Sequence, residues 1–136
     1  MRPGKPFLFG TRSHAGHTIY FTGLAGNPVS SLVAFNVFVK PLIELLSGRP
    51  ASSIQMKQAT LGCDLPANDA RAEFMRADLH LTEDGSTVAT PYERQDSSML
   101  RLLADAKCLV FRDVKAPAAK TGDTVQIVVI AGSGAF

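Results

Sequence analysis

The sequence is poor in cysteine and histidine, and both shortages argue against particular kinds of protein. The only two cysteines, Cys63 and Cys108, share no CxxC spacing, which argues against a disulfide framework and favours reduced thiols in a cytosolic protein. Free cysteine mostly behaves as a small buried hydrophobe. The three histidines, His14, His17 and His80, show no metal-ligand spacing. We therefore assign no metal ligand and no catalytic residue to this chain.

Charge is also sparse. Lysine and arginine total 14 against 12 acidic residues, a net charge of +2, which is too small to indicate a nucleic-acid partner by itself. No apolar run approaches the roughly 18 residues of a membrane span, and no extended apolar segment follows the basic N-terminus. The 136 residues, 46% of them hydrophobic, instead suit a globular protein of one or two small domains. We expect a cytoplasmic location and neither a membrane nor a nucleic-acid partner.

The first third of the chain predicts a hairpin followed by a helix. Phe7–Phe9 and His17–Phe21 resemble strands, with a polar loop over Gly10–Gly16 between them. Asn27 is a preferred N-cap and Pro28 suits the first helical position. The helix should be apolar on most of its circumference, and so buried on several sides. It should be kinked at Pro41 and end at Gly48.

The remainder is β-rich. The predicted strands are Ile54–Leu61, Arg71–Leu81, Thr87–Thr90, Cys108–Phe111 and Thr124–Ile130, with a turn at Asp84–Gly85 and a short helix over Ser97–Ala106. Several short strands with one helix favour a small β-barrel or curled sheet. The expected fold is thus an α/β remnant, a hairpin plus a buried helix, followed by a small, mostly-β, barrel-like domain. The expected limits are 1–49 for the remnant, 50–54 for a linker, 55–131 for the barrel and 132–136 for a tail.

The turn from Gly23 to Ser30 is the best candidate for chemistry. A glycine turn that leads into a helix start leaves backbone N–H groups free and points the positive end of the helix dipole outward, which favours phosphate or another oxyanion. Arg2 and Lys5 add positive charge nearby. By itself, however, such a signal more often marks only a well-capped helix.

The identity of the residues adds a resemblance. Met1–Gly10, then Gly23-Leu24-Ala25-Gly26-Asn27-Pro28-Val29-Ser30, resembles the end of the molybdopterin-binding domain of the MoeA family. Arg71–Arg76 looks like the arginine-bearing strand of that family, and Gln95–Leu100 like its glutamine–serine segment. The matching segments follow one another in order along nearly the whole chain.

The resemblance implies a set of substrate-binding residues. The family's proline-glycine-asparagine-proline loop falls on Ala25, Gly26, Asn27 and Pro28, its basic residue on Arg2, its functional arginine on Arg76 and its serine on Ser97. The implied substrate-binding set is Arg2, Lys5, Gly26, Asn27, Pro28, Ser30, Arg76 and Ser97. Without the resemblance, Arg76 reads as part of a solvated strand face and Ser97 as an N-cap.

Two departures from the family pattern affect this set. Ala25 replaces a proline and should make the loop less rigid, and Asp96 and Ser98 replace the glycines that flank the serine, adding a carboxylate. Neither change removes a catalytic group.

The resemblance further implies the reaction and its partners. Proteins of the MoeA family insert molybdate into adenylylated molybdopterin with magnesium present, and release AMP. The magnesium and molybdate ligands, the dimer-forming segments and most of the pterin-binding sheet would lie upstream of Met1. We therefore expect the chain to be part of a homodimeric enzyme and to be inactive alone.

Two other classes of function remain open. The first is a non-catalytic scaffolding module related to the same family, some of whose eukaryotic members anchor receptors. The second is a small barrel that binds nucleic acid, although the C-terminal half offers few aromatic residues for it.

Overall fold

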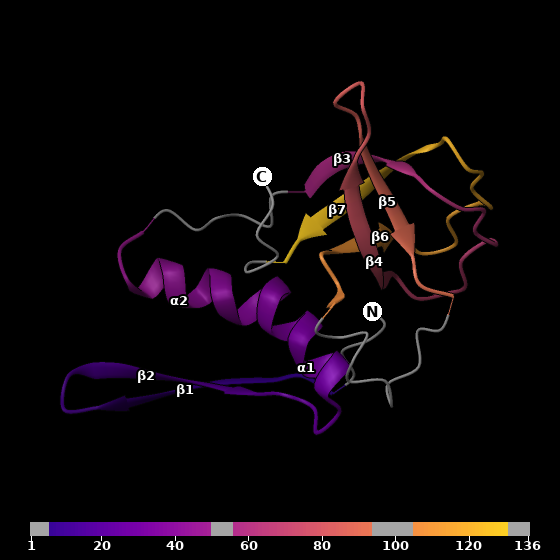
Figure 1. Ribbon diagram of the computed structural model, residues 1–136. Helices are drawn as coiled ribbons and strands as arrows, with labels where there is room; N and C mark the ends of the chain where they lie inside the picture. The colour runs from indigo at the N-terminus through magenta and orange to yellow at the C-terminus, as the bar shows by residue number, and fades with distance from the viewer. Residues whose placement is uncertain (1–5, 50–55, 94–104, 131–136) are drawn as a thin grey trace.

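The structure, a computed structural model, describes residues 6–49, 56–93 and 105–130. It has two parts that lie side by side (Figure 1): a two-stranded hairpin with one long helix, and a closed barrel of five strands. This confirms the predicted fold class. The domain limits given above stay a prediction, because the junctions between the parts fall outside the described residues.

The hairpin is longer and its turn tighter than predicted. Strands β1 (Leu8–His14) and β2 (His17–Gly23) pair antiparallel along their whole length. The turn consists of Ala15 and Gly16, whose φ values of 48° and 79° suit a two-residue hairpin turn. The loop expected over Gly10–Gly16 was therefore wrong. The polar residues of this segment can form a strand because most of the hairpin is exposed to solvent. Neither face of the hairpin therefore has to be apolar.

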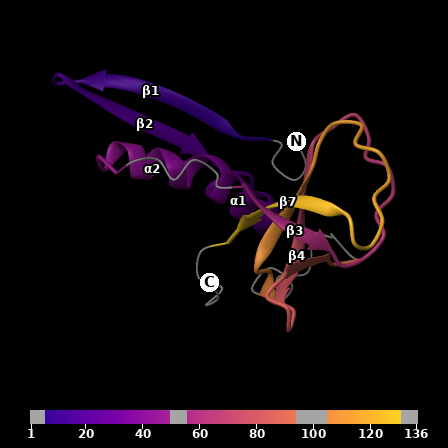
Figure 2. The ribbon, with the colours of Figure 1, turned by 90° about the horizontal axis from the view of Figure 1, so that it is seen from above.

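One continuous helix follows the hairpin. It consists of three consecutive segments, α1 (Pro28–Ala34), the π-helical η1 (Phe35–Val39) and α2 (Lys40–Leu46). Figure 2 shows that the helix and the hairpin extend in the same direction away from the barrel. The Phe7 and Phe38 rings, 4.9 Å apart between centroids, connect the hairpin to the helix. Both arms therefore project from one side of the barrel.

The ends of the helix follow the predicted signals. Asn27 is the N-cap and Pro28 occupies the first turn, while Gly48, just past the helix, has a φ of 70°. The irregularity expected at Pro41 takes the form of the π-helical segment η1. The N–H of Lys40 donates to the carbonyl of Phe35, five residues back, so the backbone is widened directly ahead of the proline.

The helix is less buried than predicted. Its buried residues all lie in α1 and η1, and α2 has none. Apolar side chains along the helix and on the hairpin are left exposed; among them are Leu8, Phe9, Phe21, Ile43, Leu45 and Leu46. The prediction of burial on several sides therefore holds only for the first half of the helix.

This helix also corrects the expectation about apolar runs. Pro28–Leu46 is 19 residues long with a mean hydropathy of 1.7, which is long and apolar enough to cross a membrane by length and composition alone. The core helix of a soluble protein meets the same two criteria, and 28% of the apolar 18-residue window within this helix is buried.

The barrel strands match the predicted strands to within two residues at each end. They are β3 (Met56–Leu61), β4 (Glu73–Leu81), β5 (Thr87–Pro91), β6 (Cys108–Arg112) and β7 (Thr124–Val129). The strand order around the barrel is β3-β5-β4-β6-β7, closed by the pairing of β7 with β3. The predicted alternation of β4 is confirmed, since Met75, Ala77 and Leu79 face the interior cluster. The predicted helix over 97–106 lies almost wholly outside the described residues.

The barrel has one weak seam. Strands β3 and β5 run parallel and pair over only two residue pairs, Thr60↔Val88 and Leu61↔Ala89. The N–H of Gly62 then donates to the carbonyl of Ala89 at 2.9 Å. This hydrogen bond extends the seam just past the end of β3.

A second cluster of apolar residues joins the helix to the outside of the barrel. Val33 and Val37 of the helix pack with Phe74 of β4 and Leu109 of β6. Leu109 and Val33 are completely buried. The first half of the helix is therefore fixed on the outward face of β4 and β6.

Asp64 ties together two loops at one end of the barrel. Its carboxylate accepts hydrogen bonds from Lys120 Nζ at 2.8 Å, the Thr121 N–H at 2.9 Å and the Thr121 hydroxyl at 3.1 Å. The hydrogen bond from Lys120, followed by those from Thr121, lowers the pKa of Asp64 from 3.8 to about 2. The ionised form is therefore favoured in the folded state.

This lowered pKa predicts a dependence of stability on pH. Because the folded pKa lies below the unfolded value of 3.8, the stabilisation by Asp64 is present above pH 4 and is lost as the pH falls towards 2. The Asp64→Asn variant should therefore lose less stability than the wild type between pH 4 and pH 2. Urea unfolding at several pH values measures this, with Glu83→Gln as an exposed control. Equal pH slopes for Asp64→Asn and wild type would contradict the assignment.

Candidate functional site

The turn before the helix is held by its own side chains. Asn27 Oδ1 accepts hydrogen bonds from the N–H groups of Val29 at 2.9 Å and Ser30 at 3.3 Å. The Ser31 hydroxyl donates to the carbonyl of Ala25. Ala25, which stands where the family has proline, is thus fixed by a hydrogen bond rather than by a ring.

These contacts correct one premise about this turn. Free N–H groups were expected at the helix start, but Pro28 has none and Asn27 engages the next two. The N–H of Ser31 donates to the Asn27 carbonyl at 3.0 Å. In this conformation the positive end of the helix dipole remains, whereas an anion would have to displace the Asn27 side chain to reach the amides.

Arg76 lies on the outward face of β4. It alternates with Ala77, which faces the barrel interior, and shares its face with Phe74 of the helix–barrel cluster. Its side chain is completely buried, with 0% exposed. The interpretation of this position as a solvated strand face is therefore wrong, because that interpretation rested on β4 alone and the helix and neighbouring strands cover the strand.

The neighbours of Arg76 follow from the strand register. Leu109 of β6 is its partner on one side. On the other side, Ala77 pairs with Pro91, so Tyr92 lies opposite Arg76, and the Tyr92 N–H donates to the Arg76 carbonyl at 3.0 Å. Arg76 is thus flanked by an aliphatic and an aromatic side chain.

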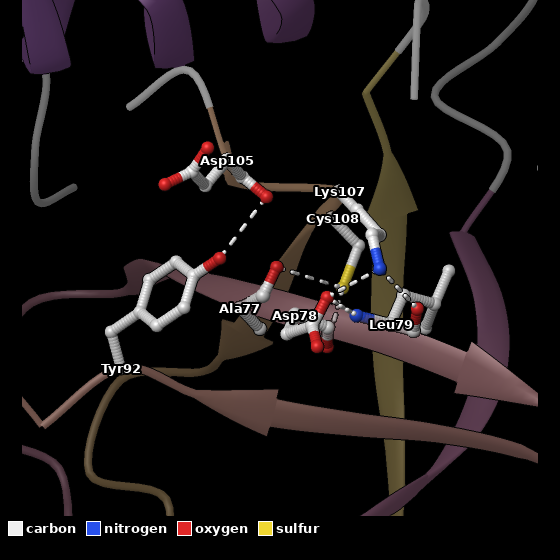
Figure 3. Close-up of polar contacts among 7 residues, drawn as sticks. All are labelled: Ala77, Asp78, Leu79, Tyr92, Asp105, Lys107 and Cys108. Atoms are coloured by element: carbon white, nitrogen blue, oxygen red, sulfur yellow. Dashed lines mark hydrogen bonds and ion pairs between the residues drawn. The ribbon is translucent and has the colours of Figure 1, made fainter. Parts of the chain in front are cut away.

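Next along this face is an ion pair. Lys107 Nζ lies 2.9 Å from Asp78 Oδ1 and 3.4 Å from the carbonyl of Leu79 (Figure 3). The hydrogen bond from Lys107 lowers the pKa of Asp78 and, in turn, raises the pKa of Lys107. Both side chains are about two-fifths exposed, so the pair can be reached from solvent.

Tyr92 completes this surface. Its hydroxyl donates to the backbone carbonyl of Asp105 at 3.1 Å (Figure 3). Burial, followed by the charges of Asp78 and Asp105, raises the pKa of Tyr92, so the hydroxyl keeps its proton at neutral pH. On β6, burial raises the pKa of the Cys108 thiol to about 12, which removes it as a nucleophile.

The structure brings together only part of the predicted site. Gly26, Asn27, Pro28 and Ser30 lie together at the helix start, and Arg76 lies on the strand face against which that helix packs. Arg2, Lys5 and Ser97 lie outside the described residues. The substrate-binding role of the whole set stays a prediction.

Sequence reasoning missed Tyr92, Asp78 and Lys107 as neighbours of Arg76. The sequence could have indicated Asp78, because it lies two residues after Arg76 and therefore on the same face of the predicted strand. Lys107 lies just before β6 and had no such signal in the sequence. Arg112, 7% exposed, is largely buried and donates to the carbonyl of Pro66 at 3.1 Å, so these two cations do not form a free basic surface.

Across the described ranges, no group of three histidine, cysteine or acidic residues lies close enough to hold a metal ion. Cys63 and Cys108 are both free thiols. The side chains of Arg76, Lys107 and Tyr92 can instead provide cationic and hydrogen-bonding contacts to a ligand.

Comparisons with known proteins agree in pointing to one family. The family described as MoeA C-terminal region (domain IV) matches residues 58–130. A molybdopterin molybdenumtransferase of Bacillus subtilis is 36% identical over 132 residues, which cover 96% of this chain and 29% of that protein. The molybdenum cofactor synthesis protein cinnamon of Drosophila melanogaster is 34% identical over 128 residues, 90% of this chain and 20% of that protein.

Solved structures give the same result. Two crystal structures of molybdopterin biosynthesis MoeA proteins from Pyrococcus horikoshii match with TM-scores of 0.71 and 0.62, at 26% and 21% identity. They cover 96% and 94% of this chain, and the chain covers 30% of each. The chain thus spans about three tenths or less of the length of these relatives.

Proposed function

The chain belongs to the MoeA family, whose C-terminal region it matches, and we propose that it forms part of the substrate-binding surface of a molybdopterin molybdenumtransferase. The proposed reaction inserts molybdate into adenylylated molybdopterin and releases AMP. The proposed partners are the remaining part of such an enzyme and a second copy of it in a homodimer. The proposed location is the cytoplasm. One observation carries the proposal: the helix that begins at Asn27 packs directly on the strand face that holds Arg76.

This packing suits an anionic substrate. The positive end of the helix dipole and the guanidinium of Arg76 belong to one helix–barrel unit, and Arg76 lies where water is excluded. Electrostatic attraction is stronger at low dielectric than in water. A substrate phosphate that reaches this unit would therefore be bound by Arg76, and it would reach the helix amides only by displacing the Asn27 side chain.

Magnesium, which the family resemblance implies, does not fit the described residues. They bring no carboxylate cluster together, and the Asp64 carboxylate is engaged by Lys120 and Thr121. We therefore assign the metal no ligand and no step in this part of the chain. Molybdate is a substrate of the proposed reaction. We likewise assign it no binding residue among the described ones.

The first test is binding of AMP and of molybdate, measured by calorimetric titration of the chain. We expect saturable AMP binding that weakens about tenfold or more in Arg76→Met, since a hydrogen bond to a charged group contributes roughly 1.5–3 kcal/mol. Arg71→Met, at an exposed position just before β4, is the matched control and should bind as the wild type does. Circular dichroism confirms that both variants fold.

Three outcomes would contradict this proposal in different ways. Equal AMP affinity in Arg76→Met and wild type would exclude Arg76 from the site. Molybdate-dependent release of AMP from adenylylated molybdopterin by the chain alone would overturn the view that it holds only part of the active site. Saturable binding of a peptide without any affinity for AMP would favour the scaffolding function, which the exposed apolar residues of the hairpin support.

A further inference from the structure

The least expected feature of the site is that its cation is completely covered. Arg76 points outward from the barrel, yet none of its surface is exposed. A guanidinium in this position cannot meet a ligand from solvent until a neighbouring group moves. A described side chain that lies across it would control this access.

Tyr92 is in the position to do so. It lies opposite Arg76 on the β5 side of β4, as the Ala77↔Pro91 register and the 3.0 Å hydrogen bond from the Tyr92 N–H to the Arg76 carbonyl establish. Its hydroxyl, however, reaches Asp105, which precedes β6 on the other side of β4. The side chain of Tyr92 must therefore cross β4.

Figure 3 shows this crossing. The ring rises from the end of β5 and extends over the ribbon of β4 towards the backbone of Asp105, while the Asp105 carboxylate points away from it. The ring also packs against the apolar cluster that joins the helix to the outward face of the barrel. Tyr92 and Arg76 thus lie on the same side of β4.

We propose that Tyr92 is a positioning residue for Arg76: it bridges the end of β5 to Asp105, in the segment that leads into β6, across the outward face of β4 and controls access to the Arg76 guanidinium. The hydrogen bond to Asp105 holds the bridge closed. Its release uncovers Arg76 without unfolding the barrel, because the bridge depends on one side chain and not on a strand pairing. The consequence for ligand binding rests on the proposed function, whereas the bridge itself does not.

Access to Arg76 can be measured without any ligand. Phenylglyoxal modifies arginine side chains that reach solvent, and mass spectrometry of proteolytic fragments gives the rate at each position. Arg71 is exposed and serves as the fast reference. Arg112, 7% exposed, is a second buried arginine on the same barrel, and it reports global unfolding.

The key variant is Tyr92→Phe, which keeps the ring and removes only the hydroxyl. We expect its Arg76 to react about three- to tenfold faster than in the wild type, as loss of one hydrogen bond predicts, with the Arg112 rate unchanged. Tyr92→Leu, which also removes the ring, should accelerate Arg76 further. Tyr20→Phe, on the hairpin, is the matched control and should leave both rates unchanged.

Three results would overturn the proposal. The first is an Arg76 rate in the wild type equal to that of Arg71. The second is an Arg76 rate that does not change in Tyr92→Phe. The third is a parallel rise at Arg76 and Arg112, which indicates loss of overall stability rather than of a local bridge. If Arg76 alone is accelerated but AMP does not bind, the bridge stands and the proposed function fails.

Discussion

Replacing Leu109 with alanine is expected to lower the free energy of unfolding by about 2–5 kcal/mol, the usual cost of removing a buried leucine side chain. Leu109 is completely buried where β6 meets the helix, in contact range of Val33, Val37 and Phe74. The cavity left by the substitution would therefore lie between the two parts of the chain. Urea-induced unfolding followed by circular dichroism measures the effect.

A second measurement locates the damage. Amide hydrogen exchange should accelerate at Val33 and Val37, because the helix loses its main contact with the barrel. Leu81→Ala is the control, since Leu81 is 53% exposed and its truncation should change stability by about 0.5 kcal/mol or less. A loss below about 1 kcal/mol for Leu109→Ala would show that the helix does not depend on this contact.

A single methyl group at Gly62 should be almost as damaging. A Cβ built there lies 2.1 Å from Thr90 Oγ1, 3.1 Å from Thr90 Cβ and 3.2 Å from Val88 Cγ1. Rotation of Thr90 relieves only the first contact, so the β3–β5 seam must shift to make room for the methyl group. We expect Gly62→Ala to destabilise the fold by about 1–3 kcal/mol, as overpacking does in other proteins.

The cause can be tested with a double-mutant cycle. Thr90→Ala removes the hydroxyl that the new methyl group meets, so the double variant should recover part of the lost stability. Gly10→Ala is the control, because a Cβ there meets nothing within 4 Å, and it should be neutral or slightly stabilising. Strictly additive effects of Gly62→Ala and Thr90→Ala would show that the clash is not the reason.

The local elements of this fold could be predicted because their signals are local. Asn27 and Pro28 define the helix start through side-chain and ring chemistry alone, and Asp84–Gly85 defines the turn between β4 and β5. The alternation in β4 also assigned its two faces correctly. Each of these signals depends on residues within a few positions of one another.

The rest depends on contacts that are distant in sequence. Barrel closure requires β3 to pair with β5 and β7, and nothing in the β3 residues specifies either partner. The burial of Arg76 depends on the strands that flank β4, and the residues of β4 do not specify these neighbours. The assignment of Asn27 as N-cap already implied that its side chain accepts hydrogen bonds from the first helix amides. The anion hypothesis nevertheless treated these amides as free.

The order of strands around the barrel also bears on how the chain folds. Strands β4 and β5, and likewise β6 and β7, are neighbours both in sequence and in the ring, whereas β3 lies between two strands that follow it much later. Loop-closure entropy must be overcome before such non-local pairs form. We therefore expect β3, the strand that follows the helix in the chain, to join the ring last and its pairing to limit the rate of folding.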